Sequence, residues 1–149
     1  MAVRVQEADF SLADEIAKLT KGRTDMGALV TFTGLVRDTD GTLQAMELEH
    51  YPAMTEAALE EIENQTITRW SLSASLIIHR YGNMKPGDQI MMVATAAPHR
   101  ADAFEAAEYL MDYLKSRAPF WKKEHLKNGQ AEWVSAKDED ETALDRWSN

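Results

Sequence analysis

Apolar and polar positions follow strand or helix periods through the first half of the chain. Residues 2–8 alternate as a short strand, and residues 27–36, rich in β-branched side chains, predict a second strand. Between them, Ser11 precedes apolar residues at helical spacing, which predicts a helix that Ser11 caps and that ends before Gly22. Residues 42–51 alternate less regularly and predict another strand, after a polar turn.

Two longer helices are predicted further along the chain. Pro52 suits the first turn of a helix whose buried stripe begins at Met54 and which ends near Trp70. The clearest helical period covers residues 100–117, where apolar side chains recur three, four and seven positions apart. Pro119 ends this helix, because proline disfavours helical geometry in the residue before it.

The remaining apolar runs predict strands. Residues 73–82 and 89–97 carry two of them, on either side of a Pro-Gly turn. A strand over residues 120–126 is followed by Asn128-Gly129, which is typical of a type I′ hairpin turn, and by a partner strand. The predicted order is β-α-β-β-α-β-β-α-β-β. Because strands occur partly in adjacent pairs, this order favours an α+β fold with a mixed or antiparallel sheet.

Length and composition favour one domain. A chain of 149 residues can bury enough apolar surface for a core without disulfides or metals. No repeat, low-complexity tract or linker interrupts the sequence, and composition changes only near the end, where it becomes strongly acidic. We therefore expect a single domain over residues 1–137, followed by an acidic tail over residues 138–149.

Charge and cysteine content narrow the possible functions. The formal net charge is −9, which argues against nucleic-acid binding, since that function needs a basic face. The chain has no cysteine, so disulfides, Cys-ligated metal centres and thiol nucleophiles are excluded. With an acidic residue at Glu7 and no apolar stretch around it, no signal peptide is expected. No apolar run is long enough for a membrane span, so we expect a cytoplasmic protein.

Positive charges nevertheless gather near the end of the 100–117 helix. Lys115 lies in its last turn, and Lys122 and Lys123 follow in a strand, where neighbouring side chains point to opposite faces. Only one of these two strand lysines needs to join Lys115. Two ammonium groups held together each lose a proton more readily, and such a lysine can act as acid, base or nucleophile. The structural alternative is that the cations favour a helix end and guard a sheet edge.

Other candidate anion-binding residues stand at predicted element ends. His99 and Arg100 begin the last long helix, whose free N–H groups attract anions, and Arg37 follows a strand into a loop. Helix capping and surface ion pairing explain the same positions equally well. A second His-Arg pair, His79-Arg80, ends another predicted strand. The four histidines have no metal-ligand spacing and there is no Gly-rich phosphate loop, so no metal or cofactor is expected.

Several segments together resemble one family. They are "GALVTFTGLVRD", "LEHYPAMTEAALEEI", "IIHRYGNMKPGDQIMMVATAAPHRADAFEA", "YLKSRAPFWKKE" and "GQAEWV", in this order. The set resembles the large, catalytic subunit of molybdopterin synthase over residues 3 to 137. The resemblance implies an α+β protein with an α/β-hammerhead fold and an additional small antiparallel β-subdomain.

The resemblance also implies an activity and partners. The family is a sulfurtransferase that converts a cyclic pyranopterin monophosphate precursor into molybdopterin by inserting two sulfurs, in molybdenum cofactor biosynthesis. A small ubiquitin-like subunit delivers the sulfur as a C-terminal Gly-Gly thiocarboxylate. The large subunit forms a homodimer within a heterotetramer. An enzyme without cysteine cannot carry the sulfur itself, which agrees with delivery by a partner.

The family's site residues transfer onto specific positions. Lys115, in "YLKSRAP", matches the essential active-site lysine, and Lys122, in "FWKKE", matches the second one, which also faces the substrate. Three more positions match residues of the anionic pocket: Arg37, His99 and Arg100. Lys137 stands where we expect a further basic residue.

Two questions stay open at the level of sequence. Lys115 could act as acid or base, or form a transient covalent adduct. The sequence also does not say which protomer supplies each site residue, because a site at a dimer interface looks the same in one chain. The competing hypothesis is a non-catalytic anion-binding or scaffold subunit that only docks a small β-grasp partner. It predicts partner binding without product.

Overall fold

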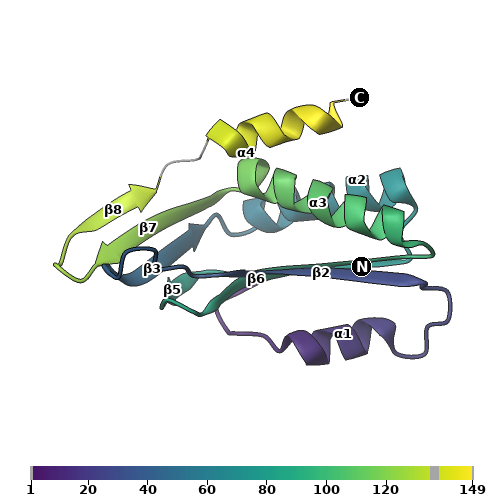
Figure 1. The fold of residues 1–149 in the computed structure, drawn as a ribbon, viewed down its shortest axis with the longest axis horizontal. Coiled ribbons are helices and arrows are strands. Elements are labelled where there is room, and N and C mark those ends of the chain that lie inside the picture. Colours follow the sequence, from purple (N-terminus) through teal and green to yellow (C-terminus); the bar gives the residue numbers. More distant parts are fainter. Residues whose placement is uncertain (1, 135–137, 149) are drawn as a thin grey trace.

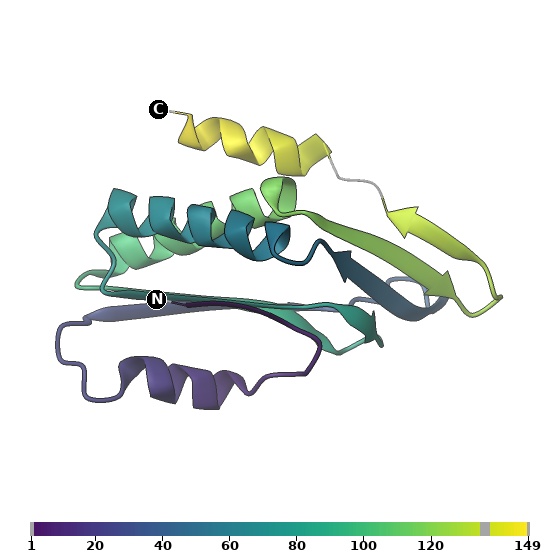
Figure 2. The same cartoon turned by 180° about the vertical axis from the view of Figure 1, so that it is seen from behind.

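The computed structural model describes residues 2–134 and 138–148, which form two sheets and the helices around them (Figures 1 and 2). In chain order the elements are β1 (Ala2–Gln6), α1 (Leu12–Thr20), β2 (Ala28–Leu35), β3 (Leu43–His50), α2 (Met54–Trp70), β4 (Ala74–Arg80), β5 (Gly82–Met84), β6 (Gln89–Ala97), α3 (Arg100–Arg117), β7 (Phe120–Leu126), β8 (Ala131–Val134), α4 (Asp138–Ala143) and the 3₁₀ helix η1 (Leu144–Trp147).

The larger sheet is mixed and has the strand order β1-β4-β6-β2. β1 pairs with β4 in parallel, and the other neighbours are antiparallel. Helices α2 and α3 cover one face and α1 covers the other (Figure 1). The central strands β4 and β6 are buried on both faces, which explains their long apolar runs.

Strand alternation divides the core of this sheet into two layers. Ile77 on β4 and Val93 on β6 pack toward α2 and α3, with Leu110 of α3 among their neighbours. Ile78 and Met92, each one position away on the same strands, belong to the cluster beneath α1. The parity matters for the site, because His79 has the same parity as Ile77 and therefore lies on the α3 side.

The smaller sheet is antiparallel throughout, with the order β5-β3-β7-β8. Its own small core contains Val36, Leu43, Leu48 and Met84. The expected α+β fold with a small antiparallel β-subdomain is thus confirmed. In the described part of the chain, no helix is both long and apolar enough to cross a membrane.

The acidic C-terminal segment packs along α3 as α4 and η1 (Figure 2). Trp147 meets the rings of Trp70 and Tyr109 edge-on, at centroid distances of 5.7 and 5.4 Å. Its Nε1 donates to Asp112 at 2.6 Å, and Arg146 binds the same carboxylate. Trp147 and Arg146 thus attach the last turn of a segment whose other charges are mostly acidic.

The predicted helix start at Pro52 is wrong. Helix α2 begins at Met54, because Ala53 lies in the left-handed region at φ 68° and interrupts helical geometry. Thr55 stabilises the tight entry, since its Oγ1 accepts from the Tyr51 N–H at 2.9 Å and donates to the Pro119 carbonyl at 3.1 Å.

Two further local predictions need correction. The hairpin after β7 forms as predicted, but not with a type I′ turn, which requires positive φ at both central residues. Only Gly129 has positive φ, at 90°, and Leu126 N–H donates to Gln130 O across a three-residue loop. Strand β5 was not predicted, because it spans only Gly82–Met84 and exists through its pairing with β3.

Candidate active site

A cavity of about 800 Å³ lies where the two sheets meet the last turns of α3. The nitrogen-bearing side chains that line it come from four separate segments: Arg37 after β2, His79 on β4, Lys115 on α3 and Lys122 on β7. Its other polar lining residues are Thr33, Thr39 and Glu124. Apolar groups such as Met91 form much of the rest of the wall. Three of the predicted site residues therefore converge within one chain.

Lys115 reaches the cavity because of its place on α3. Its neighbour Leu114 is buried in the core beneath α2, and the helix ends at Arg117, before Pro119. Lys115 is exposed on the cavity side of that last turn. Arg117, two positions on, instead forms an ion pair with Glu141 of α4 at 2.7 Å. Neighbouring cations in one helical turn thus have different surroundings.

Strand alternation separates the two lysines of β7, as predicted. Lys122 is half-buried and lines the cavity, opposite Val134 of β8. Lys123 points to the other face, where its Nζ lies 5.2 Å from the centre of the Trp133 ring. Only Lys122 joins Lys115.

Arg37 is held at the cavity rim by the backbone before and after it. Val36 is buried, its N–H donates to Asp88 O at 2.9 Å, and its carbonyl accepts from Gly87 N–H at 2.8 Å. After Arg37, the carboxylate of Asp38 accepts from the N–H groups of Gly41 and Leu43 and closes the loop. The guanidinium is thus exposed on a fixed backbone, which suits an anion contact.

His79 forms part of the cavity floor and is 8% exposed. Its ring stacks on Phe120, with centroids 3.7 Å apart and planes 18° apart. The pKa of His79 is lowered from 6.5 to about 4, chiefly by burial and in smaller part by the nearby Lys122 and Lys115, while the hydrogen bond to the Arg80 carbonyl acts in the opposite direction. The imidazole is therefore neutral at physiological pH.

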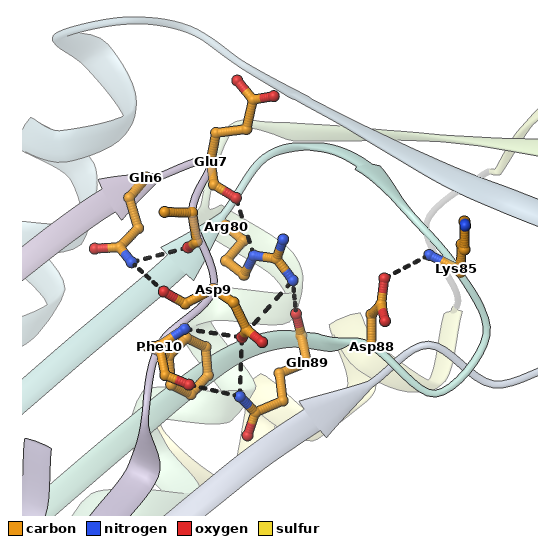
Figure 3. Close-up of polar contacts among 9 residues, drawn as sticks. Gln6, Glu7, Asp9, Phe10, Arg80, Lys85, Asp88 and Gln89 are labelled. Atoms are coloured by element: carbon orange, nitrogen blue, oxygen red, sulfur yellow. Dashed lines mark hydrogen bonds and ion pairs between the residues drawn. The ribbon is translucent and has the colours of Figure 1, made fainter. Parts of the chain in front are cut away.

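Arg80, next to His79, has a structural role (Figure 3). Its Nε donates to Glu7 O at 3.1 Å and its Nη1 to Gln89 O at 2.8 Å, and Asp9 lies 3.9 Å away. Hydrogen bonds from the Gln89 amide and the Phe10 N–H lower the pKa of Asp9, and Arg80 contributes. This network ties the segment after β1 to the ends of β4 and β6.

The pair His99 and Arg100 does not line this cavity in the same chain. Both residues are exposed at the start of α3, and His99 occupies the N-cap position without a side-chain hydrogen bond to the helix. Fifteen residues of helix separate Arg100 from Lys115, a rise of about 22 Å. Lys137, the remaining candidate, lies outside the described residues.

Sequence reasoning missed one acidic residue of the cavity and noted His79, beside Arg80, without assigning it to the site. Glu124 lies two positions after Lys122 on β7 and therefore on the same face. Once Lys122 is assigned to the site, parity alone could have found it. His79 had a weaker signal, because it ends an apolar run that resembles any buried strand.

The arrangement favours a small anionic ligand. Arg37, Lys115 and Lys122 supply positive charge to one concave surface, although the chain as a whole is acidic. Cations preorganised in a cavity can bind a phosphate or carboxylate and stabilise negative charge that develops during a reaction. Within the described residues, no three His, Asp or Glu side chains are grouped so that they could hold a metal ion.

The chain is similar to proteins of one family throughout its length. Residues 5–117 match the family described as "MoaE protein". A molybdopterin synthase catalytic subunit of Cereibacter sphaeroides is 57% identical over 147 residues, covering 99% of this chain and 100% of the relative. The Rhizobium meliloti protein of the same description is 54% identical over 149 residues, covering 99% and 96%.

Solved structures agree with this similarity. The molybdopterin biosynthesis MoaE protein from Burkholderia ambifaria has a TM-score of 0.84 and 49% identity, with 99% of each chain covered. A chain from Helicobacter pylori has a TM-score of 0.71 at 20% identity, covering 91% of this chain and 90% of that one, and so shares the fold. That structure is described as a protein–protein complex of subunits 1 and 2 of molybdopterin-converting factor.

Proposed function

Because the chain belongs to the MoaE family, whose curated relatives are molybdopterin synthase catalytic subunits, we propose that its lysine-lined cavity is the site of sulfur insertion. The substrate is a cyclic pyranopterin monophosphate. The sulfur donor is the C-terminal Gly-Gly thiocarboxylate of a small ubiquitin-like partner subunit. The expected location is the cytoplasm, and a chain without cysteine suits that reducing compartment.

One observation carries the proposal: Lys115, Lys122 and Arg37 converge on a single cavity from three different elements. A scaffold that only docks a partner does not need such convergence. The cavity volume of about 800 Å³ is within the range of small-molecule sites, so a pterin and the end of a peptide can both enter. The absence of cysteine requires the sulfur to come from outside the chain.

The transfer balances without an oxidant or reductant. The thiocarboxylate sulfur attacks a carbon of the precursor and displaces an oxygen, so that the partner's terminal acyl group becomes joined to the substrate through sulfur. Water then attacks that acyl carbon, the carbon–sulfur bond on the partner's side breaks, and the partner leaves with an ordinary carboxylate. Two such rounds give the dithiolene.

The three cations have separate roles in these steps. Lys115 transfers protons to the departing oxygen, or forms a transient adduct with the partner's acyl carbon. Lys122 and Arg37 stabilise the negative charge on the attacked groups. Each charge-assisted hydrogen bond contributes about 1.5–3 kcal/mol, so a few of them account for micromolar binding of a small anion.

We further propose that the enzyme is a homodimer in which His99 and Arg100 serve the cavity of the other copy. Strand β2 is an edge strand of its sheet and carries the exposed Phe32 and Leu35. Its start lies beside the start of α3, since Gly27 N–H donates to Ala97 O at 3.0 Å, and its end lies at the cavity. Antiparallel pairing of two β2 strands would bring the α3 start of one copy to the cavity of the other.

A mixed dimer tests this arrangement. We expect Lys115→Ala and Arg100→Ala homodimers to be inactive or nearly so. A heterodimer of the two variants can be purified with two different tags. If the residues act across the interface, one of its sites carries both substitutions and the other carries neither. It should therefore recover about half of wild-type activity. No recovery would show that both residues serve the same chain's site.

The catalytic proposal itself is tested by Lys115→Ala, with Arg117→Ala as the matched control from the same helical turn. Lys115→Ala should abolish formation of the two-sulfur product, measured by mass spectrometry with purified thiocarboxylated partner, while partner binding is retained. Arg117→Ala should keep near-normal turnover. Near-normal turnover in Lys115→Ala contradicts the role of Lys115, and partner binding without product in the wild type supports the scaffold hypothesis.

The proposed catalytic unit is residues 1–137, with residues 138–149 as an appended acidic segment. The contact of Arg117 with Glu141 and of Ser116 with Asp140 O, at 2.9 Å, joins that segment to the turn of α3 that bears Lys115.

A further inference from the structure

We propose that His79 is a positioning residue: the Lys122 side chain turns toward the ring during the reaction, and His79 Nε2 then accepts a hydrogen bond from its ammonium and directs that group within the cavity. The inference rests on the proposed function, because Lys122 matters only if the cavity is the reaction site. It adds a residue and an interaction to which the sequence resemblance assigned no role.

The first step is the tautomer of the ring. Nδ1 of His79 lies 2.8 Å from the carbonyl oxygen of Arg80. A carbonyl can only accept, so Nδ1 must carry the proton and donate it. In the neutral ring the lone pair is then on Nε2, so this atom can accept a hydrogen bond from a donor that lines the same cavity. His79 thus presents an acceptor, not a donor.

The carbonyl that fixes the tautomer is itself held firmly. Arg80 is the last residue of β4 and pairs with Gln6 of β1, and the next N–H, of Tyr81, donates to Gln6 O at 3.1 Å. The Arg80 guanidinium is fastened to the carbonyls of Glu7 and Gln89 (Figure 3). The side chain of Arg80 therefore stabilises the backbone that orients the neighbouring imidazole.

The second step is the direction of the ring. One face of His79 is stacked on Phe120, which precedes Lys122 by two positions on the same face of β7. Two residues of strand rise about 7 Å, a distance that a four-carbon lysine side chain can span back toward the ring. Both His79 and Lys122 line the cavity. The stack thus sets the imidazole edge beside the strand that carries the lysine.

The third step is charge. A neutral imidazole does not repel an ammonium, whereas a protonated one would add a further cation to Arg37, Lys115 and Lys122. Burial keeps the pKa of His79 near 4, so the acceptor form is present throughout the physiological range. The charged or titratable groups around it are Lys122, Lys115 and His50, and Arg37 and Glu124 line the same cavity.

The consequence for Lys122 is a balance of two effects. The neighbouring cations Arg37 and Lys115 favour loss of its proton, while an acceptor at His79 favours the ammonium. The hydrogen bond also sets the direction of the ammonium group. His79 therefore keeps Lys122 both charged and directed, as stabilisation of a developing anion requires.

Two substitutions separate this role from a structural one. His79→Phe keeps the ring stack on Phe120 and removes the acceptor, whereas His79→Gln loses the stack but places an amide oxygen near the position of Nε2. If His79 positions Lys122, kcat should fall about tenfold in His79→Phe and less in His79→Gln, with KM changed little. If His79 only packs, His79→Phe should be the more active variant, which overturns the proposal.

A measurement without turnover makes the outcome independent of the catalytic proposal. The side-chain amines are observed by NMR in protein labelled with ¹³C and ¹⁵N lysine, and the Lys122 signal is assigned with Lys122→Arg. We expect the pKa of the Lys122 amine to fall by about one unit in His79→Phe and to recover partly in His79→Gln. The Lys123 amine, on the opposite face, is the internal control and should not move.

An unchanged Lys122 pKa in His79→Phe overturns the inference, even if the cavity is the active site. Conversely, full turnover in Lys122→Ala would refute the catalytic use of that lysine and leave the measured hydrogen bond intact. The two failures are therefore distinguishable.

Discussion

The two faces of strand β7 carry similar residue types in different surroundings. On the inner face, Phe120, Lys122 and Glu124 line the large cavity. On the outer face, Lys123 lies over the ring of Trp133. One strand therefore places one lysine in a site and the next in a cation–π contact.

The side chains on the outer face of β7 have their polar and aromatic partners on that same face. His125 Nε2 lies 2.9 Å from Glu47 Oε1, and Trp121 approaches Tyr51 with ring centroids 5.4 Å apart. A smaller cavity of about 360 Å³ is lined there by Tyr51, Trp121 and Trp133, with Glu49, His50 and Pro52. It has mostly aromatic walls and no lysine, so it lacks the cations that an anionic substrate requires. The comparison teaches that residue type alone does not identify a site here, while strand parity does.

The largest expected effect separates the adjacent lysines. Lys122→Ala should lower kcat by about 10²–10³-fold, the usual loss when one preorganised group that stabilises developing charge is removed. Lys123→Ala, which removes the same charge from the other face, should stay within about twofold of wild type because an exposed cation–π contact is weak. The measurement is steady-state formation of the two-sulfur product. Equal losses of kcat in the two variants would contradict the functional difference between the two faces.

The next effect concerns stability in acid. Burial lowers the pKa of His79 from 6.5 to about 4, so the unfolded chain gains a proton below pH 6.5 and the folded chain does not until about pH 4. The free energy of unfolding should fall as the pH falls through this window, by up to about 3 kcal/mol for the full difference. His79→Phe should lack this component. Urea unfolding at pH 7.5 and 4.5 measures it, and a parallel decline in both proteins would contradict it.

The smallest effect lies on the outer face. The hydrogen bond from His125 lowers the pKa of Glu47, so the pair stabilises the fold above the ordinary pKa of a glutamate and loses that contribution as the pH falls through the lowered value. Because both side chains are about one-third exposed, Glu47→Gln should cost about 0.5 kcal/mol near neutral pH. Unfolding measured at pH 7 and pH 3 should show the difference at pH 7 only. A loss of several kcal/mol in the free energy of unfolding would contradict the weak contribution expected from the outer face.

Much of the fold was predictable because strong local signals agreed with tertiary contacts. The helix over 100–117 has the bounds of α3, and the strand over 120–126 has those of β7, with Pro119 between them. Prediction failed where contacts between distant segments, and not the local sequence, determine the structure. The three residues of β5 have no strand pattern of their own, and the left-handed Ala53 at the start of α2 has no sequence signal.

The site was predictable in part for a related reason. Strand parity predicted that only one of Lys122 and Lys123 would join Lys115, and Lys122 lines the cavity. The sequence could not reveal the burial of His79, because that depends on Phe120, which is 41 positions away and stacks on it across two sheets. Whether Arg100 reaches a cavity depends on a second chain, which one sequence does not describe.

The most direct test of the account asks which face receives the partner's tail. A photo-reactive diazirine at the C-terminal residue of the small subunit is activated in the complex, and the cross-linked residues of this chain are mapped by mass spectrometry. The account predicts labels on the inner-face cavity, at Lys122 or Met91, and their loss when excess pterin substrate and unlabelled partner compete. Labels confined to Trp121 and Trp133 on the outer face would contradict it.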